Sequence, residues 1–361
     1  MKKDKLSSFQ FACLLGSPIF SLFSGVGSHN LIHIAGVDAW ICVIVSFLIG
    51  LFPFTLFLYL FYASDEKNIL EMNLDLFGNV FGNFLNILIN IFLFFVGMVQ
   101  LFNISNFVIS QFLAETPILW FMILFGILII YNVSFGIENI SRVAVIFVGV
   151  IIFMTIISTA GLMPTVDTSN LKPYLENGIG TPLRGGILLT LTNVTPIFML
   201  LIIPRKRISD NKNAWKYFTF FYFLAFLFAF LAIVLSIGSL GIYLCQVYQY
   251  PEYTVLKKIS LFNFIERIEN FIYIKWILNS FITLSLVVYH LSSFIKKDSR
   301  KVVPISSTIL LILGSHYLFQ NNTLFYHIGL NIFPYVCLCL FLVYLIIGII
   351  IFGKKRTKII S

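Results

Sequence analysis

The side chains most able to do chemistry in this sequence are polar residues placed inside long apolar runs. In the first run, residues 8–33, four serines recur at helical spacing: Ser17, Ser21, Ser24 and Ser28. At about 100° per residue, these positions form one stripe along a helix. Pro18, Gly25 and Gly27 fall in the same stretch and weaken a helix there. The stripe is either a small-residue packing face or the polar lining of a cavity beside a broken helix.

A second interruption lies in residues 185–203, where polar side chains and a proline stand together: Thr190, Thr192, Asn193, Thr195 and Pro196. Because Pro196 has no N–H, a carbonyl one turn upstream loses its partner. Threonine and asparagine side chains can take the place of backbone partners. From the two interruptions and one nearby glutamine we predict these ligand-binding residues: Ser17, Pro18, Phe20, Ser21, Ser24, Gln100, Thr192, Asn193, Thr195 and Pro196.

Asparagines follow one helical face at the start of residues 79–110: Asn79, Asn83, Asn86 and Asn90. Gly97 continues this line, and Gln100 lies near it. Amide side chains inside a membrane must face protein or water. This face therefore predicts either hydrogen bonds between helices or one wall of a cavity.

Charged residues mark the outer start of residues 264–293: Glu266, Arg267, Glu269 and Lys275. At 1.5 Å per residue, Lys275 lies about 13 Å further along the helix axis than Glu266. Lys275 therefore either reaches back to the surface or pairs inside the bundle. We predict structural or gating roles for this group, as an ion-pair network or as a proton relay.

Catalytic motifs are missing from the sequence. It contains no G-x-S-x-G, no H-E-x-x-H and no phosphate-binding loop. The five histidines are scattered near the ends of apolar runs, and the five cysteines have no metal-ligand spacing. We therefore predict no enzymatic activity, no cofactor and no metal site.

The elements that must position these residues are membrane helices. Of the 361 residues, 59% are hydrophobic and 11% are charged, against about 45–50% and 25% in soluble chains. This composition excludes a soluble globule, a disordered chain and a nucleic-acid-binding domain. We predict an all-α polytopic membrane protein with ten transmembrane helices, at about 8–33, 39–62, 79–110, 117–134, 143–163, 185–203, 217–244, 264–293, 303–320 and 331–353.

The basic residues fix the expected orientation. If the N-terminus is cytoplasmic, most of the 24 Lys and Arg residues fall in inner segments. The predicted outer loops hold only Lys172, Arg184, Lys257 and Lys258. By the positive-inside rule both termini are cytoplasmic. The net charge of +9 is then a topology signal, and it does not indicate a nucleic-acid partner.

The two interruptions fall in the first and sixth of the ten spans. These are corresponding positions in two halves of five helices, a pattern typical of inverted-repeat transporter folds with a site near the membrane midplane. We predict one integral membrane domain, 1–361. Its first repeat covers about 8–163, its second about 185–320, and its final helix about 331–353.

Four stretches of the chain resemble a known family. They are Phe9-Gln10 with Asp38-Ala39-Trp40; Gly136 to Ser141-Arg142; Asn170-Leu171-Lys172-Pro173 through Gly178-Ile179-Gly180; and Phe264-Ile265-Glu266-Arg267-Ile268-Glu269 with Trp276. Over essentially its whole length the chain resembles the B subunit of spore germinant receptors of the GerA type. That family is a branch of the amino acid–polyamine–organocation superfamily.

The resemblance implies a LeuT-like five-plus-five fold with broken helices 1 and 6. It also implies a small-molecule germinant, usually an amino acid, bound between those two helices. The implied partners are a larger A-type membrane subunit and a C-type lipoprotein subunit, together with membrane lipid, in the spore inner membrane. Germinant binding would lead to ion release from the dormant spore.

One motif of the family looks altered. Members commonly carry Gly-x-Gly and then Leu-Pro around the unwound turn of helix 1, whereas this chain has the glycine-free stretch Ser17 to Ser24. We therefore expect less room for a carboxylate held by bare backbone amides. The leading hypothesis is a ligand-sensing receptor subunit. The alternatives are an amino-acid permease of the same fold and a structural subunit without a ligand.

Overall fold

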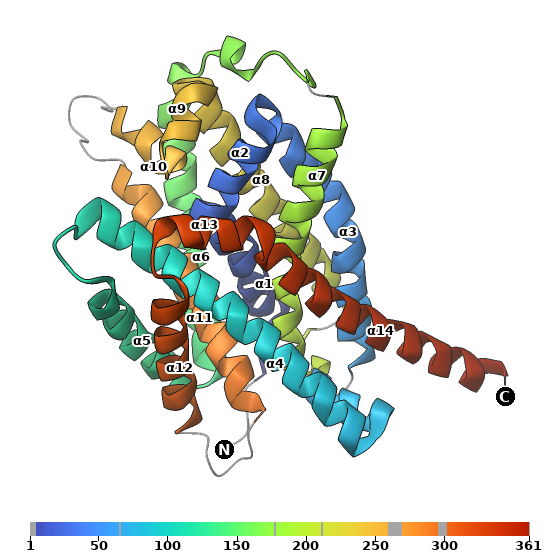
Figure 1. Ribbon diagram of the computed structural model, residues 1–361. Coiled ribbons are helices and arrows are strands. Elements are labelled where there is room, and N and C mark those ends of the chain that lie inside the picture. Colours follow the sequence, from blue (N-terminus) through green and yellow to red (C-terminus); the bar gives the residue numbers. More distant parts are fainter. Residues whose placement is uncertain are drawn as a thin grey trace.

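The computed structural model describes residues 5–64, 66–176, 178–210, 212–258, 269–294 and 302–360, and this part of the chain is almost entirely helical (Figure 1). The first pass is interrupted: α1 (Ser8–Leu22) continues through a π-helical turn, η1 (Phe23–Gly27), into α2 (Ser28–Ala35). The sixth pass has the same character, with α7 (Gly180–Leu189), a π-helical turn η5 (Thr190–Val194) and a 3₁₀ segment η6 (Thr195–Ile202). We call these broken helix 1 and broken helix 6.

The remaining long helices cover the other predicted spans. They are α3 (Ala39–Ala63), α4 (Ile69–Phe112), α5 (Ile118–Ser134), α6 (Ile137–Leu162), α8 (Ala214–Leu240), α11 (Glu269–Ser293), α12 (Val303–Leu318), α13 (Asn322–Asn331) and α14 (Phe333–Ile360). Eight helical segments of the described chain are long and apolar enough to cross a membrane, and α5 and α12 are shorter apolar helices. In their described residues, all ten predicted spans are therefore largely helical.

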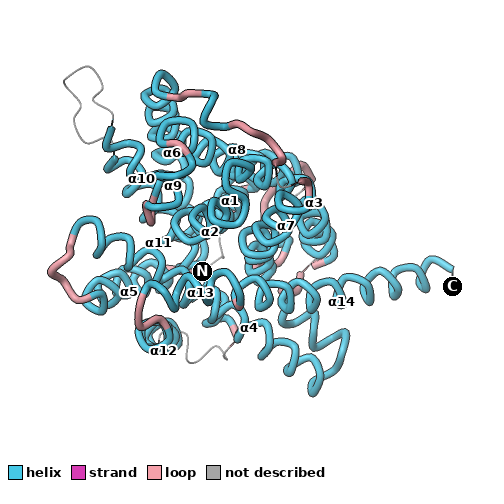
Figure 2. Tube along the Cα trace, turned by 45° about the horizontal axis from the view of Figure 1, so that its top comes forward, coloured by secondary structure: helices cyan, strands magenta, loops and turns pink. Residues whose placement is uncertain are grey.

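Short elements connect the long helices. They are η2 (Gly36–Asp38), η3 (Met163–Thr165), η4 (Thr168–Leu171), η7 (Arg205–Arg207), α9 (Ile242–Val247), α10 (Pro251–Thr254) and η8 (Val255–Lys258). Figure 2 shows how few loops separate the helices, and both views show α14 extending away from the other helices toward the C-terminus.

Burial separates the central helices from the peripheral ones. In the most apolar windows of Ser8–Gly25 and Gly180–Ile202, 78% of the residues are buried inside the protein. The corresponding share is 28% for Ile137–Thr165 and 33% for Asn322–Gly353. The peripheral helices leave apolar side chains for lipid, as expected of a membrane protein. The two broken helices therefore lie at the centre of the bundle.

The asparagine face of α4 holds a bend in that helix. The prediction began this span at residue 79, but α4 begins ten residues earlier and turns at Gly78, where φ is +75°. Asn73 Nδ2 donates to Asn86 Oδ1 at 2.7 Å, and Asn86 Nδ2 donates to the Leu70 carbonyl at 3.0 Å. Asn73 and Asn86 thus fasten the first turns of α4 back onto its main part. None of the asparagines of this face lines either of the two cavities described below.

Segments predicted to share the inner side lie together. Leu6 pairs with Ile208, with Leu6 N–H donating to the Arg207 carbonyl at 2.8 Å. Arg207 also forms an ion pair with Glu138 at 2.9 Å. Between two segments predicted to be external, Asp38 Oδ1 accepts a hydrogen bond from the Leu175 N–H at 2.9 Å. Each of these contacts therefore joins segments that were predicted to lie on the same side of the membrane.

Candidate functional site

Broken helix 1 opens at a glycine. Ser24 has an extended ψ of 136°, and Gly25 has φ +78° and ψ −101°, a conformation that L side chains rarely adopt. A Cβ at Gly25 would lie 2.3 Å from Cη2 of Trp276 and 2.8 Å from Oδ1 of Asn103. Backbone conformation and crowding therefore both require glycine at this position.

The break lies further along than the resemblance suggested. We expected a glycine-free unwound turn between Ser17 and Ser24, and this expectation is wrong. α1 runs without interruption through Pro18 to Leu22, and the non-helical backbone angles occur at Ser24 and Gly25. The break contains its own Gly-x-Gly, with Gly25 and Gly27, which the sequence had marked as weak points.

Side chains from three other elements satisfy the backbone groups that the break frees. The Gly25 N–H donates to Oε1 of Glu252, in α10, at 2.9 Å. The Ser28 hydroxyl lies 2.9 Å from the same oxygen and 3.1 Å from the Gly25 carbonyl. Asn103 Nδ2, in α4, donates to the Ser24 carbonyl at 2.9 Å. The chain thus places one of its own carboxylates on the freed amide of broken helix 1.

Local packing positions Glu252. Pro251 stands at the start of α10, where its missing N–H costs nothing. The hydroxyl of Tyr250, just before it, accepts a hydrogen bond from Asn106 Nδ2 of α4 at 2.9 Å. Glu252 is 5% exposed, and burial raises the pKa of its carboxyl, while the Gly25 amide and the Ser28 hydroxyl oppose the rise.

Broken helix 6 opens where the sequence predicted. η5 is a π-helical turn and η6 a 3₁₀ segment with Pro196 in its first turn. Asn193 Nδ2 donates to the Ile19 carbonyl of α1 at 2.9 Å, so the two broken helices touch at this level. Thr195 is fully buried, and its hydroxyl has no hydrogen-bond partner within the described residues. The Thr192 hydroxyl bonds to the Leu188 carbonyl at 3.0 Å.

Two further predicted residues link neighbouring helices to α11. The Ser21 hydroxyl lies 2.8 Å from that of Thr283, and Gln100 Nε2 donates to the Ser280 hydroxyl at 2.7 Å. Such bonds between membrane helices contribute roughly 0.6–2 kcal/mol each. They tie α1 and α4 to α11 near the break.

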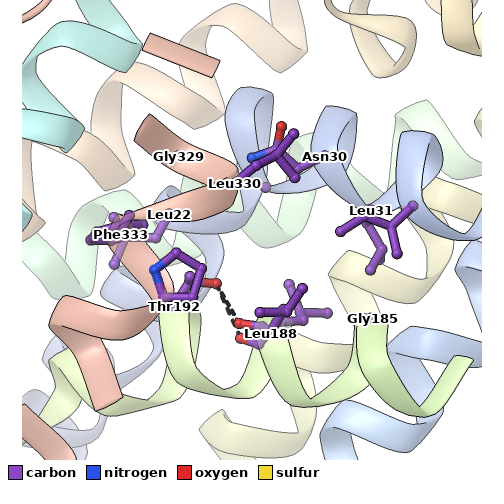
Figure 3. A pocket seen from close by; sticks show the side chains of 13 residues that line it. Leu22, Asn30, Leu31, Gly185, Leu188, Thr192, Gly329, Leu330 and Phe333 are labelled. Atoms are coloured by element: carbon purple, nitrogen blue, oxygen red, sulfur yellow. Dashed lines mark hydrogen bonds between the residues drawn. The ribbon is translucent and has the colours of Figure 1, made fainter. Parts of the chain in front are cut away.

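A small cavity lies between broken helix 1, broken helix 6 and the junction of α13 with α14 (Figure 3). Its volume is about 30 Å³. Leucines line much of it, and Asn30 of α2 and Thr192 of η5 add polar groups. The Asn30 Oδ1 is buried and lacks a partner in the described part of the chain. We call this the helix 1–helix 6 cavity.

A second cavity, of about 50 Å³, lies on another side of broken helix 1, against α6, α8, α10 and α11. Phe20, Ser24, Glu252 and Lys275 are among its lining residues. Lys275 is only 6% exposed. We call this the Glu252–Lys275 cavity.

The predicted ligand-binding residues divide into three groups. Thr192 lines the helix 1–helix 6 cavity, and Phe20 and Ser24 line the Glu252–Lys275 cavity. The others line neither cavity and lie in the surrounding helices: Ser17, Pro18, Ser21, Gln100, Asn193, Thr195 and Pro196.

The predicted charged group is only partly described. Glu266 and Arg267 lie outside the described residues, as does the side chain of Glu269, the first residue of α11. Lys275 is described and lines a cavity together with Glu252.

Sequence analysis missed Glu252, Asn103 and the α11 hydroxyls of Ser280 and Thr283. Glu252 lies in a segment predicted to be an external loop, whereas the predicted functional residues were taken from the apolar spans. A carboxylate between Tyr250 and Tyr253, directly after a proline, was the available signal. It could not reveal which backbone group this carboxylate would meet.

Comparison with known proteins identifies the family. The model of a family described as spore germination protein matches residues 5–323. The chain belongs to this family. Spore germination protein KB of Bacillus subtilis (strain 168) is 26% identical, with 99% of this chain and 98% of the relative covered. Spore germination protein A2 of the same organism is 23% identical (88% and 87% covered), and spore germination protein XB of Bacillus anthracis is 23% identical (77% of both).

A solved transporter has the same fold. The structure titled as the substrate-bound outward-open state of a Na⁺-coupled sialic acid symporter matches with a TM-score of 0.59. Sequence identity is 14%, and the match covers 89% of this chain and 79% of the symporter. The family member described here is therefore a LeuT-like polytopic membrane protein, as the sequence predicted.

Proposed function

We propose that this chain is the ligand-sensing membrane subunit of a spore germinant receptor, and that it binds a small germinant of the amino-acid class between helices 1 and 6. The observation that carries the proposal is the contact between the break of helix 6 and α1, one turn before the break of helix 1, where Asn193 Nδ2 donates to the Ile19 carbonyl at 2.9 Å. Broken helices in this fold expose backbone and hydroxyl groups to a ligand near the membrane midplane. Membership of the spore germination protein family supports the biological role.

Sensing requires a ligand that prefers one of two states. A germinant of equal affinity for both would shift no equilibrium, whatever its affinity. The elements suited to move are α2 and α7, the outer halves of the broken helices, because each joins the inner half through a single π-helical turn. Closure of these halves over the germinant is the change that partner subunits would read.

The proposed assembly includes a larger A-type membrane subunit and a C-type lipoprotein subunit in the spore inner membrane. Both termini of this chain are proposed to be cytoplasmic. The Leu6–Ile208 pairing supports this placement, because it joins the N-terminal segment to the basic loop that carries Arg205, Lys206 and Arg207.

The test is the germination response of spores that carry Thr195→Val. Valine has almost the shape of threonine, and the Thr195 hydroxyl has no partner in the described part of the protein. Its removal therefore breaks no hydrogen bond among the described residues. If the germinant bonds this hydroxyl, the half-maximal germinant concentration rises about tenfold, in line with roughly 1–1.5 kcal/mol for a lost hydrogen bond.

Thr308→Val is the matched control. Thr308 is equally buried, but it lies in the peripheral helix α12, and its hydroxyl donates to the Pro304 carbonyl of its own helix at 2.7 Å. The control should respond like wild type. An unchanged dose-response in Thr195→Val, with normal protein level, removes Thr195 from the site. The same result for Ser21→Val would remove the proposed position between the broken helices.

A further inference from the structure

Two oppositely charged side chains share one buried cavity. Glu252 is 5% exposed and Lys275 is 6% exposed, and both line the Glu252–Lys275 cavity. They come from different elements, α10 and α11. A buried charge is costly unless a partner compensates it. The two side chains therefore need partners that their surroundings must provide.

The described residues provide only part of that compensation. Oε1 of Glu252 accepts from Gly25 and Ser28, but Oε2 is buried without a hydrogen-bond partner. No ion pair or hydrogen bond to the Lys275 ammonium occurs within the described part of the chain, and Glu252 and Lys275 do not approach each other within ion-pair distance. One anionic and one cationic group are thus left around the same space.

The cavity is large enough for a small organic molecule. Its volume of about 50 Å³ holds roughly three to five waters at about 10–15 Å³ each, and these waters would occupy about 100–150 Å³ of liquid. A small amino acid needs a comparable space. Phe20, Phe228 and Ile272 supply apolar wall, and Ser24, Thr155 and Ser158 supply hydroxyl groups.

Glu252 also changes what the break in helix 1 can recognise. Free N–H groups at the end of a half-helix normally favour an anionic group. Here the Gly25 N–H already holds the Glu252 carboxylate. A ligand carboxylate must therefore find another cation, and the cavity offers Lys275. A ligand ammonium, in turn, finds the unpartnered oxygen of Glu252.

We propose that the Glu252–Lys275 cavity is a second binding site, which takes a small zwitterion with its ammonium group on Glu252 and its carboxylate on Lys275. This site is distinct from the position between helices 1 and 6, because no residue of broken helix 6 lines the cavity. Only a ligand with both an ammonium and a carboxylate group can pair with Glu252 and Lys275 at the same time.

The experiment measures equilibrium binding of labelled L-alanine and labelled glycine to the purified full chain in lipid nanodiscs. Ethylamine and propionate, which each keep one charge of alanine, serve as competitors. The wild type should bind both labelled zwitterions. Ethylamine or propionate should displace them only at a concentration at least tenfold higher than unlabelled alanine requires. Glu252→Gln and Lys275→Met should each weaken zwitterion binding at least tenfold.

The variants are chosen so that folding does not decide the result. Glutamine keeps an acceptor for the Gly25 N–H, and methionine replaces a buried charge by an apolar side chain of similar length. In Lys275→Met, which keeps Glu252, ethylamine should displace the label as effectively as unlabelled alanine does. In Glu252→Gln, which keeps Lys275, propionate should displace it as effectively as alanine does. A merely structural role for either residue would not produce this exchange of preference.

Glu66→Gln is the matched control for loss of a carboxylate, since Glu66 pairs with Lys206 and both side chains are exposed. It should bind like wild type. Wild-type binding by both cavity variants, equal binding of alanine and its single-charge analogues, or no saturable binding of either zwitterion would each overturn the proposed site. Thr195→Val separates the two proposals, because it should leave the affinity of the Glu252–Lys275 cavity unchanged.

Discussion

At the scale of residues, the break in helix 1 depends on a glycine and a distant carboxylate. Only glycine fits at position 25, where φ is +78° and Trp276 and Asn103 leave no room for a Cβ. The Gly25 N–H that this conformation frees donates a hydrogen bond to Glu252. These residues are 227 positions apart in the chain. The glycine that allows the break is a local feature of the sequence, but the geometry of the break depends on a tertiary contact.

Gly25→Ala should destabilise the protein through two separable effects. The positive φ costs about 1–2 kcal/mol for a residue with a Cβ, and the collision with Trp276 adds roughly 1–3 kcal/mol of overpacking. Gly36→Ala is the control, because Gly36 has φ +56° but nothing within 4 Å of an added Cβ. In detergent, thermal unfolding should show a clearly lower Tm for Gly25→Ala than for Gly36→Ala. Equal Tm values would refute the crowding at the break.

At the scale of elements, hydrogen-bonding side chains hold the irregular parts of long helices. The start of α4 bends at Gly78 and is fastened through Asn73 and Asn86. In broken helix 6, Thr190 and Thr192 bond to carbonyls of their own helix at 2.9 and 3.0 Å. Polar residues in these spans thus satisfy backbone and side-chain groups that lipid cannot.

Asn86→Leu should release the first turns of α4. The change leaves the Asn73 amide and the Leu70 carbonyl without their partner, at a cost of about 1–3 kcal/mol. Hydrogen exchange of residues 69–77 should accelerate. Asn83→Leu is the control, since Asn83 is exposed and bonds only to the Asn79 carbonyl one turn back. Equal exchange in the two variants would contradict the role of Asn86.

Much of the element pattern was predictable, because a span needs a long apolar run and a half-helix needs a disruptive residue. The ten spans and the opening at Thr190 to Pro196 followed from such local features. The break in helix 1 was expected in the glycine-free stretch Ser17 to Ser24, because the family resemblance implied the unwound turn there. The actual position depends on contacts with Glu252, Asn103 and Trp276, which no local pattern reveals.

At the scale of the whole molecule, the fold is that of a transporter and the family is that of spore germination proteins. Ligand binding is common to a transporter and to a receptor built on this fold. What separates them is whether the bound molecule is released on the other side. The central claim, a sensing subunit, therefore concerns the completion of a cycle rather than the chemistry of a site.

The most direct test compares binding with uptake for one purified preparation. A labelled amino-acid panel is first bound to the full chain at equilibrium and then offered to proteoliposomes that contain it, with empty liposomes as the control. We predict saturable binding of at least one amino acid and uptake no greater than that of empty liposomes. Saturable uptake of the bound amino acid above the empty-liposome level would contradict the account and make the chain a permease.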